Sequence, residues 1–135
     1  MAILTWNETY SVGIKTFDEH HQHLISFINS LYDAMKEGKG NQEVQSTIQK
    51  LIEYTVFHFS SEEKLLLEKG YPGYPIHLKE HQALKARVID FQDRINKGEL
   101  GMSVKLANFL KEWLTSHILG EDKKYGPFLQ AKGIK

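Results

Sequence analysis

Cysteine is absent from the 135-residue chain, which excludes disulfide bonds, thiolate metal sites and a cysteine nucleophile. An excess of charge is absent too: 17 basic residues balance 17 acidic ones, so nothing indicates a nucleic-acid or membrane partner. No apolar run has the length to span a membrane, and the N-terminus lacks a signal-peptide pattern. The length suits one domain with a substantial core, and we expect a cytoplasmic protein.

Strand-like alternation is weak throughout, whereas four segments show the spacing of apolar side chains that is typical of amphipathic helices. The first helix should run from about residue 18 to 37, and the second should follow Asn41, which can cap it. The third should begin near Ile76, and the fourth should follow Ser103, a second candidate cap.

Short connections between four helices of similar length predict an all-α fold, an antiparallel up-down-up-down four-helix bundle. Residues 1–16 precede the first helix and should form an N-terminal arm across the bundle. Trp6 and Tyr10 are the arm's candidates for packing against the helices.

The chain has seven histidines, and five of them fall in register with the apolar stripes of the helices: His21, His58, His77, His81 and His117. His20 and His23 fit the first stripe less well, so we expect them at the surface. The acidic residues that leave the stripes should be solvated as well; they include Glu63, Glu68 and Glu80.

Burying several imidazoles together with carboxylates is costly unless their polar atoms find partners. For one histidine alone, the simpler interpretation is a half-buried ring bonded to a carbonyl group. A bound metal explains the whole set, because neutral imidazoles coordinate it and carboxylates neutralise its charge. Glu62, one helical turn after His58, is the first candidate carboxylate.

Asp122 follows His117 by five residues, and on a regular helix two such side chains point about 140° apart. Either Asp122 faces solvent, or the helix widens or ends there and the carboxylate returns to the interior. Gly120 lies between them and would ease such a distortion, and wide turns recur at functional sites. The spacing leaves both alternatives open.

If five histidines, Glu62 and Asp122 converge, they are too many ligands for one structural zinc ion, which takes four. Two octahedral metals offer about twelve positions, of which these side chains and one shared oxide or hydroxide would fill about eleven. A nitrogen-rich and oxygen-rich pair with one open position suits iron and a diatomic ligand, above all dioxygen.

The order and spacing of these residues resemble the signature of the hemerythrin family, in its bacterial single-domain form. The resemblance rests on FDEHHQHLI around His21, HFSSE from His58, HLKEH from His77, HILGEDKKY from His117, and Trp6 in the arm. It implies one hemerythrin-like domain over residues 1–135. One departure is His20, where glutamine is usual in the family.

The resemblance implies two iron ions (Fe2+/Fe3+) bridged by Glu62, Asp122 and an oxide or hydroxide. It divides the histidines between them: His77, His81 and His117 on one iron, His21 and His58 on the other, which keeps the open position. Dioxygen would bind there as hydroperoxide, taking its proton from the bridging hydroxide and returning it on release.

Family members also imply an apolar lining for the oxygen pocket: Leu24, Phe59, Trp113, Leu114 and Ile118. Apolar residues at helical spacing would form the core of any bundle, so ordinary packing is the alternative for each of them. Tyr125 can fasten the C-terminal tail without taking part in the chemistry.

Reversible dioxygen binding, for carriage, storage or sensing and without enzymatic catalysis, is therefore the first hypothesis. A di-iron oxidase or peroxidase is the second, but such bundles use four carboxylates where this chain offers two with five histidines. The third is a sensor of oxygen, nitric oxide or iron that acts through a partner. An oxygen-consuming enzyme or a signalling protein could be that partner, and the sequence identifies neither.

Overall fold

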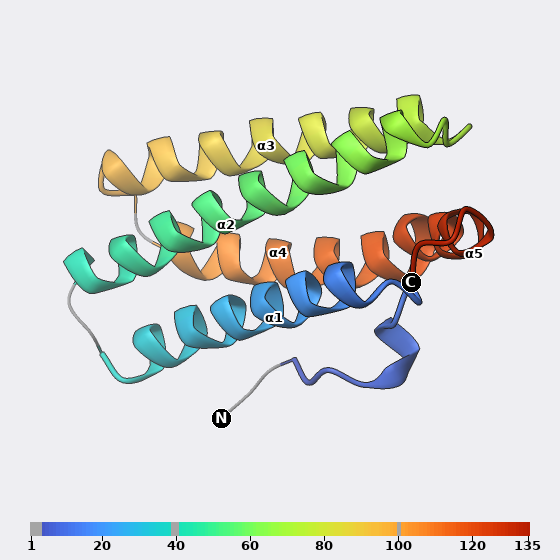
Figure 1. Cartoon of the computed structure of the whole chain (residues 1–135). Helices are drawn as coiled ribbons and strands as arrows, with labels where there is room; N and C mark the ends of the chain where they lie inside the picture. The colour runs from blue at the N-terminus through green and yellow to red at the C-terminus, as the bar shows by residue number, and fades with distance from the viewer. Residues whose placement is uncertain (1–3, 39–40, 100) are drawn as a thin grey trace.

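The structure, a computed structural model, describes residues 4–38, 41–99 and 101–135, and within these ranges it contains helices and no strands (Figure 1). Residues 1–3 of the expected arm lie outside the described part. Four long helices follow one another: α1 (Lys15–Lys36), α2 (Asn41–Glu68), α3 (Tyr74–Asn96) and α4 (Met102–His117). Three short elements accompany them: the 3-10 turn η1 (Glu8–Tyr10), the π-helical turn η2 (Ile118–Asp122) and α5 (Lys123–Ala131).

The four long helices form a bundle in which successive helices run in opposite directions, as Figure 1 shows. Helix α1 packs against α2 and α4, and α3 packs against the same two helices. The apolar stripes face inward and supply the buried core. This arrangement confirms the all-α, up-down-up-down bundle predicted from the spacing of apolar residues.

The helix starts differ from those expected, for local reasons. Helix α1 begins three residues before Asp18, whose carboxylate accepts hydrogen bonds from Ser11 Oγ (2.6 Å) and from the Val12 amide (2.8 Å) in the preceding arm. Helix α4 begins at Met102, directly after Gly101, whose left-handed backbone (φ 77°) cannot belong to the helix. Ser103 therefore lies inside the first turn rather than at the cap.

The N-terminal arm packs along the bundle through buried Leu4, Val12 and Ile14. Trp6 and Tyr10 are partly buried against the core, with ring centroids 6.0 Å apart, which confirms their expected packing role. The arm thus runs along α1, where the Asn29 side chain pairs with the backbone of Leu4, to the end of the bundle at which α1 begins.

Helix α5 is an element that the sequence did not predict, and it closes the same end of the bundle against the arm (Figure 1). Gln130 Nε2 donates a hydrogen bond to the Gly13 carbonyl (3.0 Å). At Gly126 a Cβ would lie 2.1 Å from the Val12 carbonyl oxygen, so only glycine permits this approach. Within the described residues, no helix combines the length and apolar character needed to cross a membrane.

Candidate metal centre

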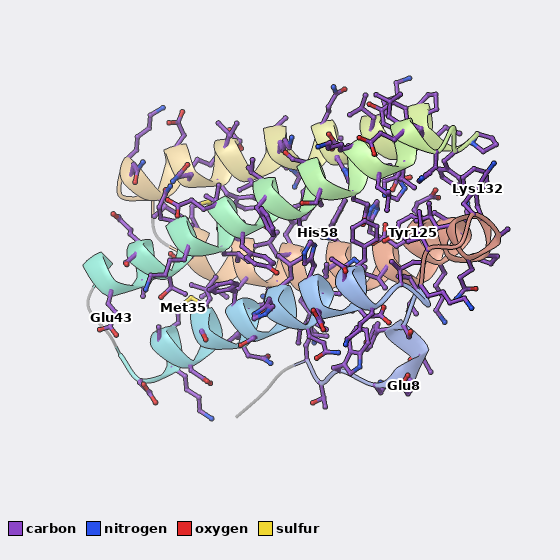
Figure 2. All side chains as sticks on the ribbon, in the orientation of Figure 1. Glu8, Met35, Glu43, His58, Tyr125 and Lys132 are labelled. Carbon is purple, nitrogen blue, oxygen red and sulfur yellow. The ribbon has the colours of Figure 1, made fainter. Side chains whose placement is uncertain are left out.

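The bundle interior contains a cluster of histidine and carboxylate side chains from all four long helices and the π-helical turn. None of its members is more than 4% exposed: His21, His58, Glu62, His77, His81, His117 and Asp122. Figure 2 shows two labelled side chains of this region, His58 and Tyr125, lying between the helices. The structure thus brings together every metal-binding residue that the sequence predicts.

The candidate ligand atoms form two groups, and within each group all of them lie within 4.8 Å of one another. The three-histidine group contains His77, His81 and His117, and the two-histidine group contains His21 and His58. Glu62 and Asp122 belong to both groups. We use these two names for the groups below.

The two carboxylates face the groups with different oxygens. Glu62 Oε1 contacts His77 Nε2 and lies 3.3 Å from His81 Nε2, whereas Glu62 Oε2 lies 3.1 Å from His58 Nε2. Glu62 therefore presents one oxygen to each group, which is the arrangement that a ligand shared by two metal ions needs.

Asp122 repeats this division. Its Oδ1 lies 3.0 Å from His77 Nε2 and 2.9 Å from His117 Nε2, and its Oδ2 lies 3.1 Å from His21 Nε2. The π-helical turn explains how Asp122 reaches the interior: its wider turn absorbs the five-residue spacing from His117. Of the two alternatives left open by the sequence, the structure contains the widened helix.

Several of these buried atoms lack a hydrogen-bond partner. Both ring nitrogens of His21 and both carboxylate oxygens of Asp122 make no hydrogen bond, although His21 Nε2 lies 3.1 Å from Asp122 Oδ2. Buried polar atoms without partners are rare in folded proteins, and a bound ion is one established explanation. The donor set of imidazole nitrogens and carboxylate oxygens fits a pair of transition-metal ions.

The electrostatics of the metal-free cluster favour ionised carboxylates. Burial alone would raise the pKa of Glu62, but the imidazoles of His58, His77 and His81 lower it well below its usual range. Burial and Glu62 would raise the pKa of Asp122, and His117 with His21 outweighs them, so this pKa is lowered too. Both carboxylates thus carry the charge that a cation requires.

The surroundings shift the pKa values of His58 and His77 in opposite directions. Burial lowers the pKa of His58 and outweighs the neighbouring carboxylates. Burial also acts to lower the pKa of His77, but the contacts with Asp122 and Glu62 outweigh it and raise this pKa to about 10. In the metal-free protein His77 therefore holds a proton at neutral pH, which a metal would have to displace.

Three residues that the sequence placed at the surface contact the second ring nitrogen of a predicted ligand. His20 is only 8% exposed, and its Nδ1 lies 2.8 Å from His58 Nδ1. Glu63 Oε2 lies 2.8 Å from His81 Nδ1, and Glu80 Oε1 lies 3.2 Å from His117 Nδ1. The surface prediction was thus wrong for His20, whereas Glu63 and Glu80 keep side-chain exposures of 17% and 35% and each has a histidine partner that the sequence did not predict.

The other two surface predictions, for His23 and Glu68, are confirmed, since both residues are exposed.

Burial also affects His20: together with the nearby His58 and His21 it lowers the pKa of His20 to about 4. His20 is therefore neutral at physiological pH in the metal-free protein.

Tyr125 lies inside the bundle, fully buried, and its hydroxyl donates a 2.8 Å hydrogen bond to Glu62 Oε2. The ring also contacts Phe17 of α1 edge-on, with centroids 5.6 Å apart. Tyr125 thus fastens the C-terminal segment, as expected, and in addition supports one of the two shared carboxylates.

Aromatic rings cover the three-histidine group on one side. Phe59 stacks on His81 with ring centroids 3.7 Å apart, and Trp113 stacks on His117 at 4.3 Å. Next to them is a small apolar cavity of about 20 Å³. Its lining includes four of the five predicted pocket residues: Leu24, Phe59, Trp113 and Leu114. Ile118 is fully buried but does not line this cavity.

Comparison with known proteins agrees with this geometry. Residues 12–129 match the family model described as the hemerythrin HHE cation binding domain. A bacteriohemerythrin of Methylococcus capsulatus is 33% identical over 132 residues, which cover 97% of this chain and 100% of the relative. A myohemerythrin of Sipunculus nudus is 28% identical over 120 residues, which cover 89% and 88%.

The solved structures lead to the same family. The crystal structure of a wild-type hemerythrin superposes on this chain with a TM-score of 0.88 at 31% identity, covering 93% of this chain and 97% of that one. The full-length match to the relatives, the shared fold and the buried cluster of histidines and carboxylates together establish that the chain belongs to the hemerythrin family.

Proposed function

We propose that the protein binds dioxygen reversibly at a non-haem di-iron site. The observation that carries this proposal is the shared pair of carboxylates, each of which faces a group of three imidazoles with one oxygen and a group of two with the other. One position has one protein ligand fewer than the other, and that inequality provides the place for a diatomic ligand.

In this proposal the ligands are divided as the geometry groups them. His77, His81 and His117 would hold one iron, His21 and His58 would hold the other, and Glu62 and Asp122 would be shared between the two. When bound, the two iron ions supply the electrons that dioxygen takes up on binding and returns on release. The carboxylates balance their charge, and the Tyr125 hydroxyl holds Glu62 in its bridging orientation.

The apolar residues beside the cluster keep water away from the binding position. Leu24, Phe59, Trp113 and Leu114 line the small cavity, and Ile118 is fully buried in the core. A dry wall matters because water and protons that reach bound dioxygen would turn reversible binding into irreversible oxidation of the iron.

We further propose that the protein binds dioxygen for carriage, storage or sensing and does not act as an enzyme. Five imidazoles with two carboxylates support this, since oxidising di-iron bundles use four carboxylates. We treat residues 1–135 as one domain, because the core includes side chains from the arm through α5. The cytoplasmic location and an oxygen-consuming or signalling partner stay predictions.

The test combines metal analysis with visible spectra. The reconstituted protein should hold about two irons per chain and show an oxo-to-iron charge-transfer band. Reduction should bleach this band, and air should restore an oxygenated spectrum that reverses when oxygen is removed. His23→Ala is the matched control, because His23 is exposed and outside the cluster. A protein that folds fully with one zinc and never takes up iron would overturn the proposal.

A further inference from the structure

His20 stands out because the cluster of predicted ligands does not include it, yet it is buried against one of them. Its ring is held between aromatic side chains, with centroids 5.8 Å from Phe17, 5.9 Å from Tyr54 and 5.2 Å from Phe57. Its plane stands at 86° to that of His58. The packing thus fixes the direction in which His20 Nδ1 points.

The contact between the two rings has a defined direction once His58 binds a metal. His58 Nε2 faces the cluster, 3.1 Å from Glu62 Oε2, so Nε2 is the nitrogen that coordinates. A neutral imidazole that coordinates through Nε2 carries its proton on Nδ1. His58 Nδ1 then donates to His20 Nδ1 across the 2.8 Å contact, and His20 carries its own proton on Nε2.

The same relation occurs twice more in the bundle, with a different acceptor. Glu63 of α2 contacts Nδ1 of His81 on α3, and Glu80 of α3 contacts Nδ1 of His117 on α4. In each case, a residue next to a predicted ligand on one helix pairs with a predicted ligand on the next helix. His20 occupies this place between α1 and α2.

The acceptors differ in chemical type, and this distinguishes the two groups. Partners of the second ring nitrogen fix the orientation of a ligating histidine and raise its basicity, a carboxylate more strongly than a neutral group. In the three-histidine group, the Nδ1 atoms of His81 and His117 contact the carboxylates of Glu63 and Glu80. In the two-histidine group, His58 Nδ1 contacts an imidazole in place of a carboxylate, and His21 Nδ1 makes no hydrogen bond.

We propose that His20 is a positioning residue that orients His58 and thereby sets the metal affinity of the two-histidine position. The inference rests on the proposed dinuclear site. It implies ordered loading: the three-histidine position, with more ligands and carboxylate partners, fills first, and the two-histidine position fills second and depends on His20.

The experiment is a stepwise titration of the metal-free full-length protein with Zn2+ or Co2+ against a competing chelator. Wild type should show two binding steps. His20→Leu should weaken the second step by about 10–100-fold, the usual effect of removing such a partner, and leave the first unchanged. His20→Gln should restore the second step, because its amide oxygen can accept the His58 proton. His23→Leu, three residues further along the same helix, is the control and should match wild type.

A second measurement needs no substitution. In the zinc-loaded wild type, nitrogen-15 NMR should locate the His58 proton on Nδ1 and the His20 proton on Nε2. With Co2+, the visible spectrum of the second step should change in His20→Leu and recover in His20→Gln. A proton on His58 Nε2 would overturn the proposed orientation.

The outcomes separate the inference from the proposed function. A wild-type protein that binds fewer than two metal ions contradicts the dinuclear site itself. A wild type with two steps, beside a His20→Leu variant with both steps unchanged or both weakened equally, contradicts only the role of His20.

Discussion

The hydroxyl of Tyr125 provides a sharp test of how the protein supports Glu62. Burial, with the charges of Glu62 and Asp122, raises the pKa of Tyr125 well above its usual value, so the hydroxyl keeps its proton and donates to Glu62 Oε2. Tyr125→Phe removes one oxygen atom and leaves the ring packing intact. The expected loss is therefore that of one hydrogen bond to a charged acceptor, about 1.5–3 kcal/mol of unfolding free energy.

Metal binding should reduce this loss. A metal ion bound to Glu62 withdraws negative charge from the carboxylate. The hydrogen bond from Tyr125 then resembles one between neutral groups, which contributes about 1 kcal/mol. Urea unfolding of the metal-free and metal-loaded forms measures both values. Tyr71→Phe is the control: Tyr71 is half-buried, and its ring meets that of Tyr125 edge-on at 6.5 Å. Equal losses in the two variants, or no loss in Tyr125→Phe, would refute the reasoning.

Three further predictions concern metal binding and the apolar side chains beside the cluster. Asp122→Ala should lower the metal content below two per chain, whereas Glu121→Ala, which removes a contact with Lys124, should not; metal analysis after dialysis decides. Leu114→Ala should cost about 2–5 kcal/mol in urea unfolding and speed decay of the oxygenated spectrum at unchanged iron content. Metal binding near pH 7 should release protons, because the pKa of His77 is raised to about 10; calorimetry without any dependence on buffer ionisation enthalpy would contradict this.

The bundle and the cluster were predictable because both depend on the periodicity of single helices. Apolar residues that recur every three or four positions define the buried face, and a histidine in register with them must share that face. His81 and Leu84 of α3 illustrate this, since both are buried on one stripe. The same logic places His58 and Glu62 together on α2.

Local backbone geometry was less predictable. The five-residue spacing between His117 and Asp122 permits the π-helical turn without requiring it, since Asp122 could equally have faced solvent on a regular helix. Gly120 has open space where a Cβ would lie and no positive φ, so the turn does not need glycine for steric reasons. Helix α5 depends on the distant contact between Gly126 and Val12, which no local pattern shows.

The sequence did not predict that His20, Glu63 and Glu80 contact the predicted ligands, and the reason is the same for all three. Each is adjacent in sequence to a predicted ligand and so lies about 100° from it around the helix, off the buried stripe. An imidazole, however, points one nitrogen at the metal and the other outward, across the boundary with the neighbouring helix. The partner of this second nitrogen must therefore come from the side of the neighbouring helix. The apolar periodicity of that neighbouring helix predicts a solvated side chain at such a position. Identifying such partners requires the pairing of two helices, which is a property of the bundle and not of either stripe.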